Sequence, residues 1–116
     1  MSDASSVTES VLGHHLGAFV SKDLDQLLSD FTEESILIGP DATYKGLDAI
    51  RGFFTPFLEG FTQEMIDALN LQRQDVQGEY AYIVWDLGDI APLGTDTFHV
   101  VDGKIMMQSF AVYMPG

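Results

Sequence analysis

The chain has 116 residues, a length typical of one domain, and its 46% of hydrophobic residues is enough for a core. The 18 acidic and 5 basic residues give a formal net charge of −13, which argues against binding to nucleic acid or to an anionic membrane. The absence of cysteine excludes disulfides, thiolate chemistry and cysteine-ligated metals. We therefore expect residues 1–116 to form one soluble domain.

Neither a targeting signal nor a membrane span is indicated. Residues 1–6 are polar and carry Asp3 where a signal peptide would be basic. The longest apolar runs, such as Ala81–Trp85, are far shorter than the ~20 residues that cross a bilayer. Cytoplasm is the expected location.

The first half of the chain predicts helices. Ser6 to Glu9 has the pattern of a capping box that opens a helix. Apolar residues with helical spacing follow, at Val11, Leu12, Leu16, Phe19 and Val20. His15 lies within this stripe, so its side chain should face inward. A short second helix is expected at 24–31, and a third from about Leu47 to an irregular end marked by Pro56 and Gly60.

The second half predicts strands, after two short extended segments at 35–38 and 43–45. Residue types alternate from about Gln63 onward, and strands are expected at 65–71, 79–87, 95–101 and 104–114. Asp102-Gly103 is a strong hairpin signal. Helices followed by an antiparallel meander predict an α+β fold with helices on one sheet face.

Four ordered motifs resemble the nuclear transport factor 2-like (SnoaL-like) superfamily. They are KDLD at 22–25, FTEESILI at 31–38, YKGLDAIRGFF at 44–54 and DTFHVVDGKI at 96–105. The resemblance implies a cystatin-like cone, in which a strongly curved mixed sheet wraps three helices around a pocket. It also implies frequent dimers through the outer sheet face. The superfamily includes isomerases, cyclases, epoxide hydrolases, dehydratases and non-catalytic association domains, so fold alone does not name a function.

His15 and Asp96 are the candidate catalytic residues. Histidine titrates near neutrality, and an inward histidine is either a structural hydrogen-bonding group or a pocket acid, base or donor. Alternation places Asp96 on the same strand face as Phe98, where an unpaired carboxylate must find a partner or raise its pKa. The resemblance implies an oxyanion-hole role at both positions, as in the ketosteroid isomerase branch. We expect the two side chains to lie within hydrogen-bond reach.

The sequence departs from known members at the catalytic base. The isomerase branch has an aspartate before the proline that ends its first strand, and this chain has Gly39 there; Asp41 is expected in an exposed loop. The epoxide hydrolase branch needs an Asp-Arg-Asp arrangement, which neither Arg51 nor Arg73 completes. No cofactor is expected. His14 is expected at the surface and His99 away from Asp96, so a metal is not expected either.

The remaining pocket wall is expected to be apolar. The predicted ligand-binding residues are Tyr44, Trp85, Phe98, Gln108, Phe110 and Val112. The alternative is that the same residues form plain core, because an aromatic stripe is more often core than site. Tyr80, Tyr82 and Val84 share the opposite strand face and are expected to form a homodimer interface.

Three hypotheses follow. The first is an isomerase, cyclase or dehydratase that acts on a small apolar carbonyl or hydroxyl compound through His15 and Asp96. The second is a non-catalytic ligand-binding module with the same pocket. The third is an association domain with a filled pocket that functions through its outer sheet face.

Overall fold

The computed structural model describes residues 3–115; residues 1, 2 and 116 of the expected domain lie outside this part. Its helices are α1 (Ala4–Val20), α2 (Leu24–Leu28), α3 (Gly46–Gly60) and α4 (Gln63–Ala68). Its strands are β1 (Phe31–Ile38), β2 (Thr43–Lys45), β3 (Asn70–Gln77), β4 (Tyr80–Asp86), β5 (Leu93–Val101) and β6 (Lys104–Tyr113). The predicted α+β class is confirmed.

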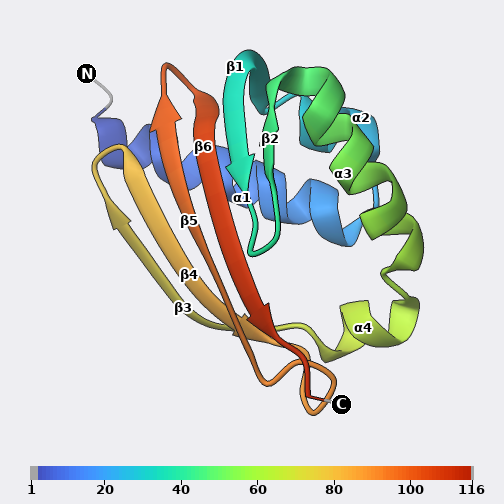
Figure 1. The fold of residues 1–116 in the computed structure, drawn as a ribbon. Helices are drawn as coiled ribbons and strands as arrows, with labels where there is room; N and C mark the ends of the chain where they lie inside the picture. Colours follow the sequence, from blue (N-terminus) through green and yellow to red (C-terminus); the bar gives the residue numbers. More distant parts are fainter. Residues whose placement is uncertain (1–2, 116) are drawn as a thin grey trace.

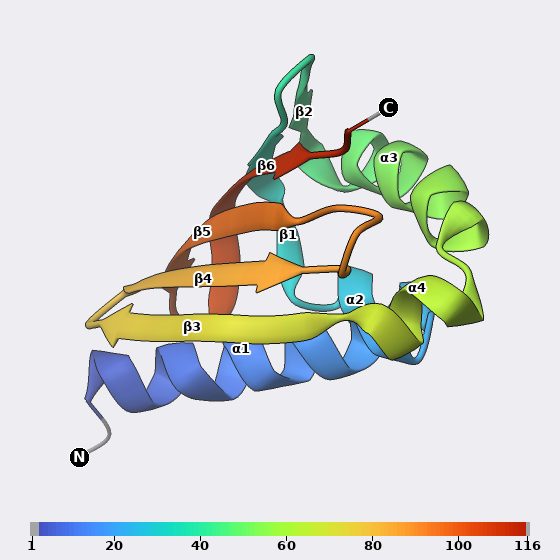
Figure 2. The ribbon, with the colours of Figure 1, turned by 90° about the horizontal axis from the view of Figure 1, so that it is seen from below.

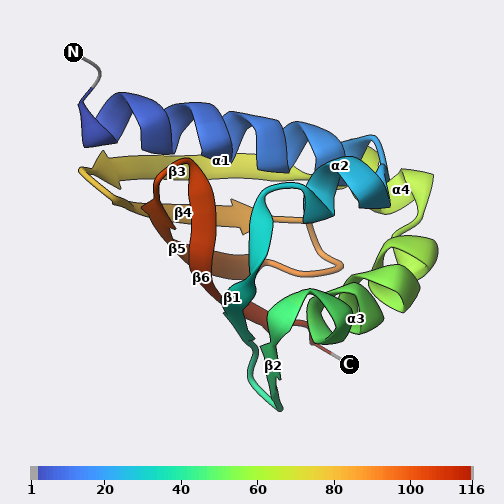
Figure 3. The same cartoon turned by 90° about the horizontal axis from the view of Figure 1, so that it is seen from above.

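The strands form one six-stranded sheet in the order β2-β1-β6-β5-β4-β3. Strands β1 and β6 pair in parallel and the other neighbours pair antiparallel, so the sheet is mixed. The sheet is strongly curved, and the helices lie on its concave side (Figure 1). Seen from either end, the sheet, α1 and α3 enclose a roughly triangular interior (Figures 2 and 3). This is the cone that the resemblance implied.

Alternation along β4 decides which side chains enter this interior. Ala81 and Ile83 are buried against the helices, whereas Tyr80 and Tyr82 are 54% and 37% exposed on the convex face. The opposing helices contribute Leu12 and other buried apolar residues to the same core. Burial of each large apolar side chain contributes about 1.5–3 kcal/mol to folding.

The first helix begins earlier than its expected capping box. Asp3 is the N-cap, and its carboxylate accepts the backbone N–H of Ser6 at 2.7 Å. An aspartate cap satisfies one of the free N–H groups of the first turn as well as serine does. The start expected at Ser6 is therefore wrong by one turn.

The segment expected as a strand at 65–71 is mostly helical. Thr62 caps α4 by accepting the backbone N–H of Met65 at 3.2 Å, and the strand β3 begins only at Asn70. The α4 residues are at most partly buried, and Met65, Ile66 and Ala68 pack against the cluster of Phe61, Leu87 and Ala91. A helix of 6 residues is too short for helical spacing to be distinguished from an imperfect alternation. Helix α3 includes Pro56 and ends at Gly60, the last residue of its expected end. No helix within residues 3–115 is long and apolar enough to cross a membrane.

Candidate functional site

A cavity of about 360 Å³ lies between α1, α3 and the concave face of the sheet. Phenylalanine and tryptophan side chains form the largest group in its wall: Phe19, Phe53, Phe54, Phe57, Phe61, Trp85, Phe98 and Phe110. Aliphatic side chains and Gly17 complete the apolar part. The polar side chains in the described lining are His15, Asp96 and Gln108. A mostly apolar hollow with a few convergent polar groups is typical of small-molecule sites.

Asp96 is the ionisable group at the centre of the polar wall. It lies in β5, directly across from Phe110 in β6. Its Oδ1 accepts the indole N–H of Trp85 at 2.7 Å, and its Oδ2 accepts Nε2 of Gln108 at 2.8 Å. Desolvation raises the pKa of Asp96, and the hydrogen bonds from Gln108 and Trp85 oppose that rise. None of the described lining residues is Lys or Arg, so the carboxyl group has no cationic partner there.

Gly94 makes the position of Trp85 possible. The two residues are cross-strand partners in β5 and β4. A Cβ atom on Gly94 would overlap the indole ring, at atoms Cε2, Cζ2 and Cδ2 of Trp85. The missing side chain therefore lets the indole lie flat over the strand with its N–H at Asp96. The sequence did not indicate this role, because a single glycine in a strand forms no motif that identifies its neighbour across the sheet.

His15 enters the cavity region from α1 and is held by aromatic rings. Its imidazole packs edge-on against Phe31, Phe54 and Phe98, at centroid distances of 5.8, 6.3 and 5.4 Å. Burial, followed by repulsion from His14, lowers the pKa of His15 to about 4. The ring is therefore neutral at physiological pH. Its Nδ1 is buried and has no hydrogen-bond partner within residues 3–115.

The expected direct pair between His15 and Asp96 is absent from the described contacts. Both hydrogen-bonding partners of Asp96 are other side chains, Trp85 and Gln108, which occupy one carboxylate oxygen each. His15 and Asp96 nevertheless line the same cavity. The two groups can therefore meet through a molecule bound between them, and Asp96 does not orient the imidazole itself.

Of the six predicted wall residues, four line the cavity: Trp85, Phe98, Gln108 and Phe110. Tyr44 and Val112 are not among the described lining residues. Tyr44 lies behind the wall, with its ring 5.0 Å from that of Phe53. Val112 packs against the apolar cluster of Phe61, Leu87 and Ala91 next to α4.

The helical part of the wall was missed as a site. Phe53, Phe57 and Phe61 of the α3 segment fall at successive turns and line the cavity together with Phe19 of α1. Their i, i+4 spacing places them on one helix face, which was a usable signal. The same spacing also describes an ordinary core helix, so the pattern could not distinguish a wall from a packed interior.

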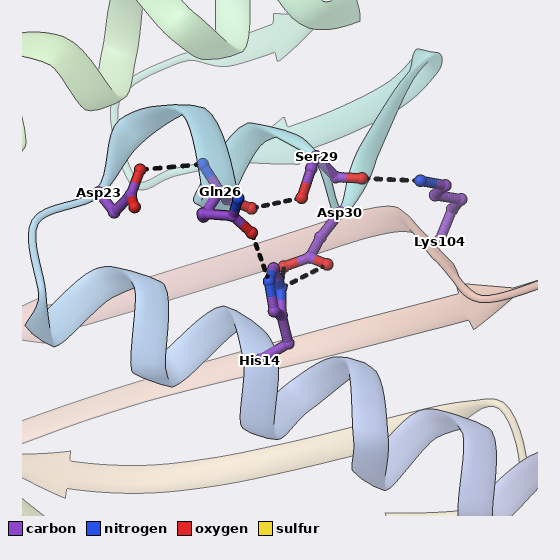
Figure 4. A network of polar contacts seen from close by, with 6 residues as sticks. All are labelled: His14, Asp23, Gln26, Ser29, Asp30 and Lys104. Carbon is purple, nitrogen blue, oxygen red and sulfur yellow. Dashed lines mark hydrogen bonds and ion pairs between the residues drawn. The ribbon is translucent and has the colours of Figure 1, made fainter.

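His14 points away from the cavity into a separate polar network (Figure 4). Its Nδ1 lies 2.8 Å from Oδ2 of Asp30, and its Nε2 lies 3.0 Å from Oε1 of Gln26. Because both nitrogens face acceptors, the bond to Asp30 and then that to Gln26 raise the pKa of His14. Burial raises the pKa of Asp30, and the His14 bond opposes this. Nζ of Lys104 donates to the Ser29 carbonyl at 2.7 Å, so the network joins α1, α2 and the β5–β6 hairpin.

The other polar candidates lie outside the cavity lining. His99 bonds Glu79 at 3.0 Å and stacks on Tyr80. Arg51 is 3.9 Å from Asp25, and Arg73 is 3.0 Å from Asp75. Within residues 3–115, no group of three or more His, Cys, Asp or Glu side chains could hold a metal ion.

Gly39, at the place of the isomerase base, is closely packed by an aromatic ring. A Cβ atom there would lie 3.0 Å from Cζ of Phe110. A carboxylate at this position would therefore require Phe110 to move. Proton abstraction by a first-strand aspartate is not available to this chain.

Residues 12–107 match the SnoaL-like domain. The chain belongs to the SnoaL-like family. No curated protein matches it. The family assignment agrees with the cone, the mixed sheet and the cavity described above.

Solved structures with the same fold are distant in sequence. An NTF2-like protein of unknown function from Mesorhizobium loti is 20% identical, with a TM-score of 0.77 over 97% of this chain and 96% of that one. Another NTF2-like protein of unknown function, from Burkholderia xenovorans, is 14% identical, with a TM-score of 0.79 over 97% and 88%. A protein from Kribbella flavida, described provisionally as a ketosteroid isomerase, is 16% identical, with a TM-score of 0.71 over 98% and 85%. At these identities the likeness shows the fold alone.

Proposed function

We propose that this SnoaL-like protein binds a small, mostly apolar molecule carrying a carbonyl or hydroxyl group, and that it catalyses proton transfer on that molecule. The observation that carries the proposal is Asp96, an ionisable carboxyl group held by Trp85 and Gln108 in a mostly apolar cavity. A carboxyl group with a raised pKa in a hollow is a candidate acid or hydrogen-bond donor. This is the chemistry of an isomerase, cyclase or dehydratase.

His15 supplies the second group. A neutral imidazole has one acceptor nitrogen and one donor nitrogen, so it can take a proton from a ligand or hold a developing oxyanion. Nδ1 of His15 has no hydrogen-bond partner within residues 3–115, and His15 is among the residues that line the cavity. In this mechanism the ligand carbonyl is bound at the Asp96–Gln108 pair, His15 removes a proton from the adjacent carbon, and Asp96 is the acid that protonates the oxygen of the resulting enolate.

Exchange of α-protons in D₂O tests this reaction directly. Acetylcyclohexane is a suitable neutral ketone, and loss of its α-proton signals can be followed by NMR. We expect the protein to accelerate exchange, and His15→Gln and Asp96→Asn each to lower the rate on the order of 100-fold. Tyr44→Phe, behind the wall, is the matched control and should exchange like the wild type.

The runner-up function is ligand binding without catalysis. It uses the same cavity but needs no acid or base. A ketone that binds tightly yet exchanges at the rate seen without protein, in both wild type and His15→Gln, would favour this function over the enzyme.

We propose that the protein is a cytoplasmic homodimer formed through the convex sheet face. Tyr80 and Tyr82 are large and exposed there, and Arg73 lies over the Tyr82 ring at 5.8 Å. Exposed aromatic residues with arginine are enriched at protein interfaces. Light scattering should give twice the chain mass for the wild type and one chain mass for Tyr82→Asp. A wild-type mass of one chain would refute the dimer without affecting the cavity.

A further inference from the structure

Gln108 has an unusual environment for an amide side chain. It is 4% exposed, and its Nε2 donates to Oδ2 of Asp96 at 2.8 Å. Its Oε1 is also buried and has no hydrogen-bond partner within residues 3–115. A buried carbonyl oxygen without a donor is unfavourable, because the bond it would make to water is not replaced. The side chain therefore has one amide end held by Asp96 and the other end without a partner, and Gln108 is among the residues that line the cavity.

This orientation suits the ionised form of Asp96. A carboxylate only accepts, and each of its oxygens receives one N–H, from Trp85 and from Gln108. A protonated Asp96 would have an O–H to donate. The Trp85 indole cannot accept it, because its nitrogen is a donor only.

The Gln108 amide can accept a hydrogen bond from that O–H if its oxygen and nitrogen exchange places. Rotation about its last side-chain bond exchanges Oε1 and Nε2, and this torsion is broad and roughly two-fold. The Asp96 O–H would then donate to Oε1. The Nε2 group would take the free end, where it can donate to a ligand.

We propose that Gln108 couples the protonation state of Asp96 to the kind of polar group that the cavity binds. With Asp96 ionised, the free end of Gln108 is the acceptor Oε1, which matches a ligand hydroxyl. With Asp96 protonated, the free end is the donor Nε2, which matches a ligand carbonyl. The inference rests on the proposed function in that the cavity holds a ligand, and it makes Gln108 a specificity-determining residue.

Few other groups complicate this coupling. The described cavity lining comes from α1, α3, the segments at Phe61 and Leu69, and strands β3 to β6. Its titratable side chains are Asp96 and His15. His15 stays neutral above about pH 4 because its pKa is lowered to about 4. Above that pH, Asp96 is the lining side chain whose protonation state changes, and a ligand in the cavity would respond to that change.

Two probes with one skeleton test the inference: acetylcyclohexane and 1-cyclohexylethanol, a ketone and its alcohol. Their affinities are measured by calorimetry over a pH series that brackets the titration of Asp96. We expect the ketone-to-alcohol affinity ratio to rise about tenfold as pH falls, the equivalent of one hydrogen bond made or lost.

Two variants separate this role from simple packing. Asp96→Asn carries a permanent N–H that can donate to Oε1 of Gln108, so it should show the low-pH ketone preference at every pH. Gln108→Met keeps the length of the side chain without its polar ends, so it should bind both probes with a ratio that does not change with pH.

The outcomes distinguish the inference from the proposed function. If both probes bind the wild type with a pH-independent ratio, the Gln108 coupling is refuted and the cavity site stands. If Asp96→Asn prefers the alcohol, the coupling is also refuted. If neither probe binds the wild type at any pH, the proposed function fails and the inference with it.

Discussion

Gly94→Ala should destabilise the protein by about 3 kcal/mol and displace the indole of Trp85 from Asp96. The added methyl group would overlap the ring, so the tryptophan must leave its position. Overpacking of this kind costs about 1–3 kcal/mol, and leaving Oδ1 of Asp96 without the Trp85 donor adds about 1–3 kcal/mol. Urea unfolding followed by circular dichroism measures the loss. Emission from Trp85, the single tryptophan of the chain, reports the movement of the ring.

A double-mutant cycle with Trp85→Leu is the control for this prediction. If the methyl group acts through the indole, Gly94→Ala should cost little once the ring is gone, and the coupling should be about 2 kcal/mol. Equal losses of unfolding free energy in the two backgrounds would contradict this account. They would show that Gly94 is needed for the backbone conformation and not to make room for the Trp85 ring.

Acidification should remove about 3 kcal/mol of stability through His15. The pKa of His15 falls from 6.5 to about 4 in the folded protein, and a pKa difference of one between the folded and unfolded states corresponds to about 1.4 kcal/mol. Between these pH values the unfolded chain binds a proton that the folded protein does not. The stability contributed by the neutral imidazole is therefore complete above pH 6.5 and is lost as pH falls towards 4.

The His15→Gln variant isolates this effect. Asp96 has a raised pKa, so it changes stability in the opposite direction, losing stability as pH rises through its folded pKa. That contribution and those of the other groups are common to both proteins and cancel in the difference. The difference in unfolding free energy between wild type and His15→Gln should shift by about 3 kcal/mol between neutral pH and pH 4. A constant difference would mean that His15 titrates normally.

Local sequence patterns predicted the structure correctly where a single strand or turn determines it. The alternation in β4 and β5 correctly separated Ala81 and Ile83 from Tyr80 and Tyr82, and placed Asp96 on the cavity side. The Asp102-Gly103 turn lies between β5 and β6 as predicted, with Asp102 at φ 52° and Gly103 at φ 78°. Periodicity and turn chemistry are properties of neighbouring residues, so they can be read without the fold.

The arrangement around Asp96 depends on register across three strands. Trp85, Asp96 and Gln108 come from β4, β5 and β6, and the β5–β6 register shifts between His99 and Val100. Counting back from the hairpin therefore misplaces the partners of Asp96 by one residue. The expected His15–Asp96 bond is absent for a related reason, because the distance between a helix and a sheet depends on packing and not on spacing.

A matched pair of glycine substitutions in α1 tests the central claim, that the aromatic cavity is the ligand site. Open space surrounds the Cβ position of both Gly13 and Gly17, but Gly17 lines the cavity and Gly13 does not. Replacement by leucine should stabilise the helix by somewhat under about 1 kcal/mol at either position. Only Gly17→Leu places a new side chain at the cavity.

Calorimetric titration with acetylcyclohexane then locates the ligand. We expect wild type and Gly13→Leu to bind the ketone alike, and Gly17→Leu to bind it at least about tenfold more weakly, or about 1.4 kcal/mol. Equal binding by Gly17→Leu and Gly13→Leu would place the ligand elsewhere and contradict the assignment of the cavity as the site.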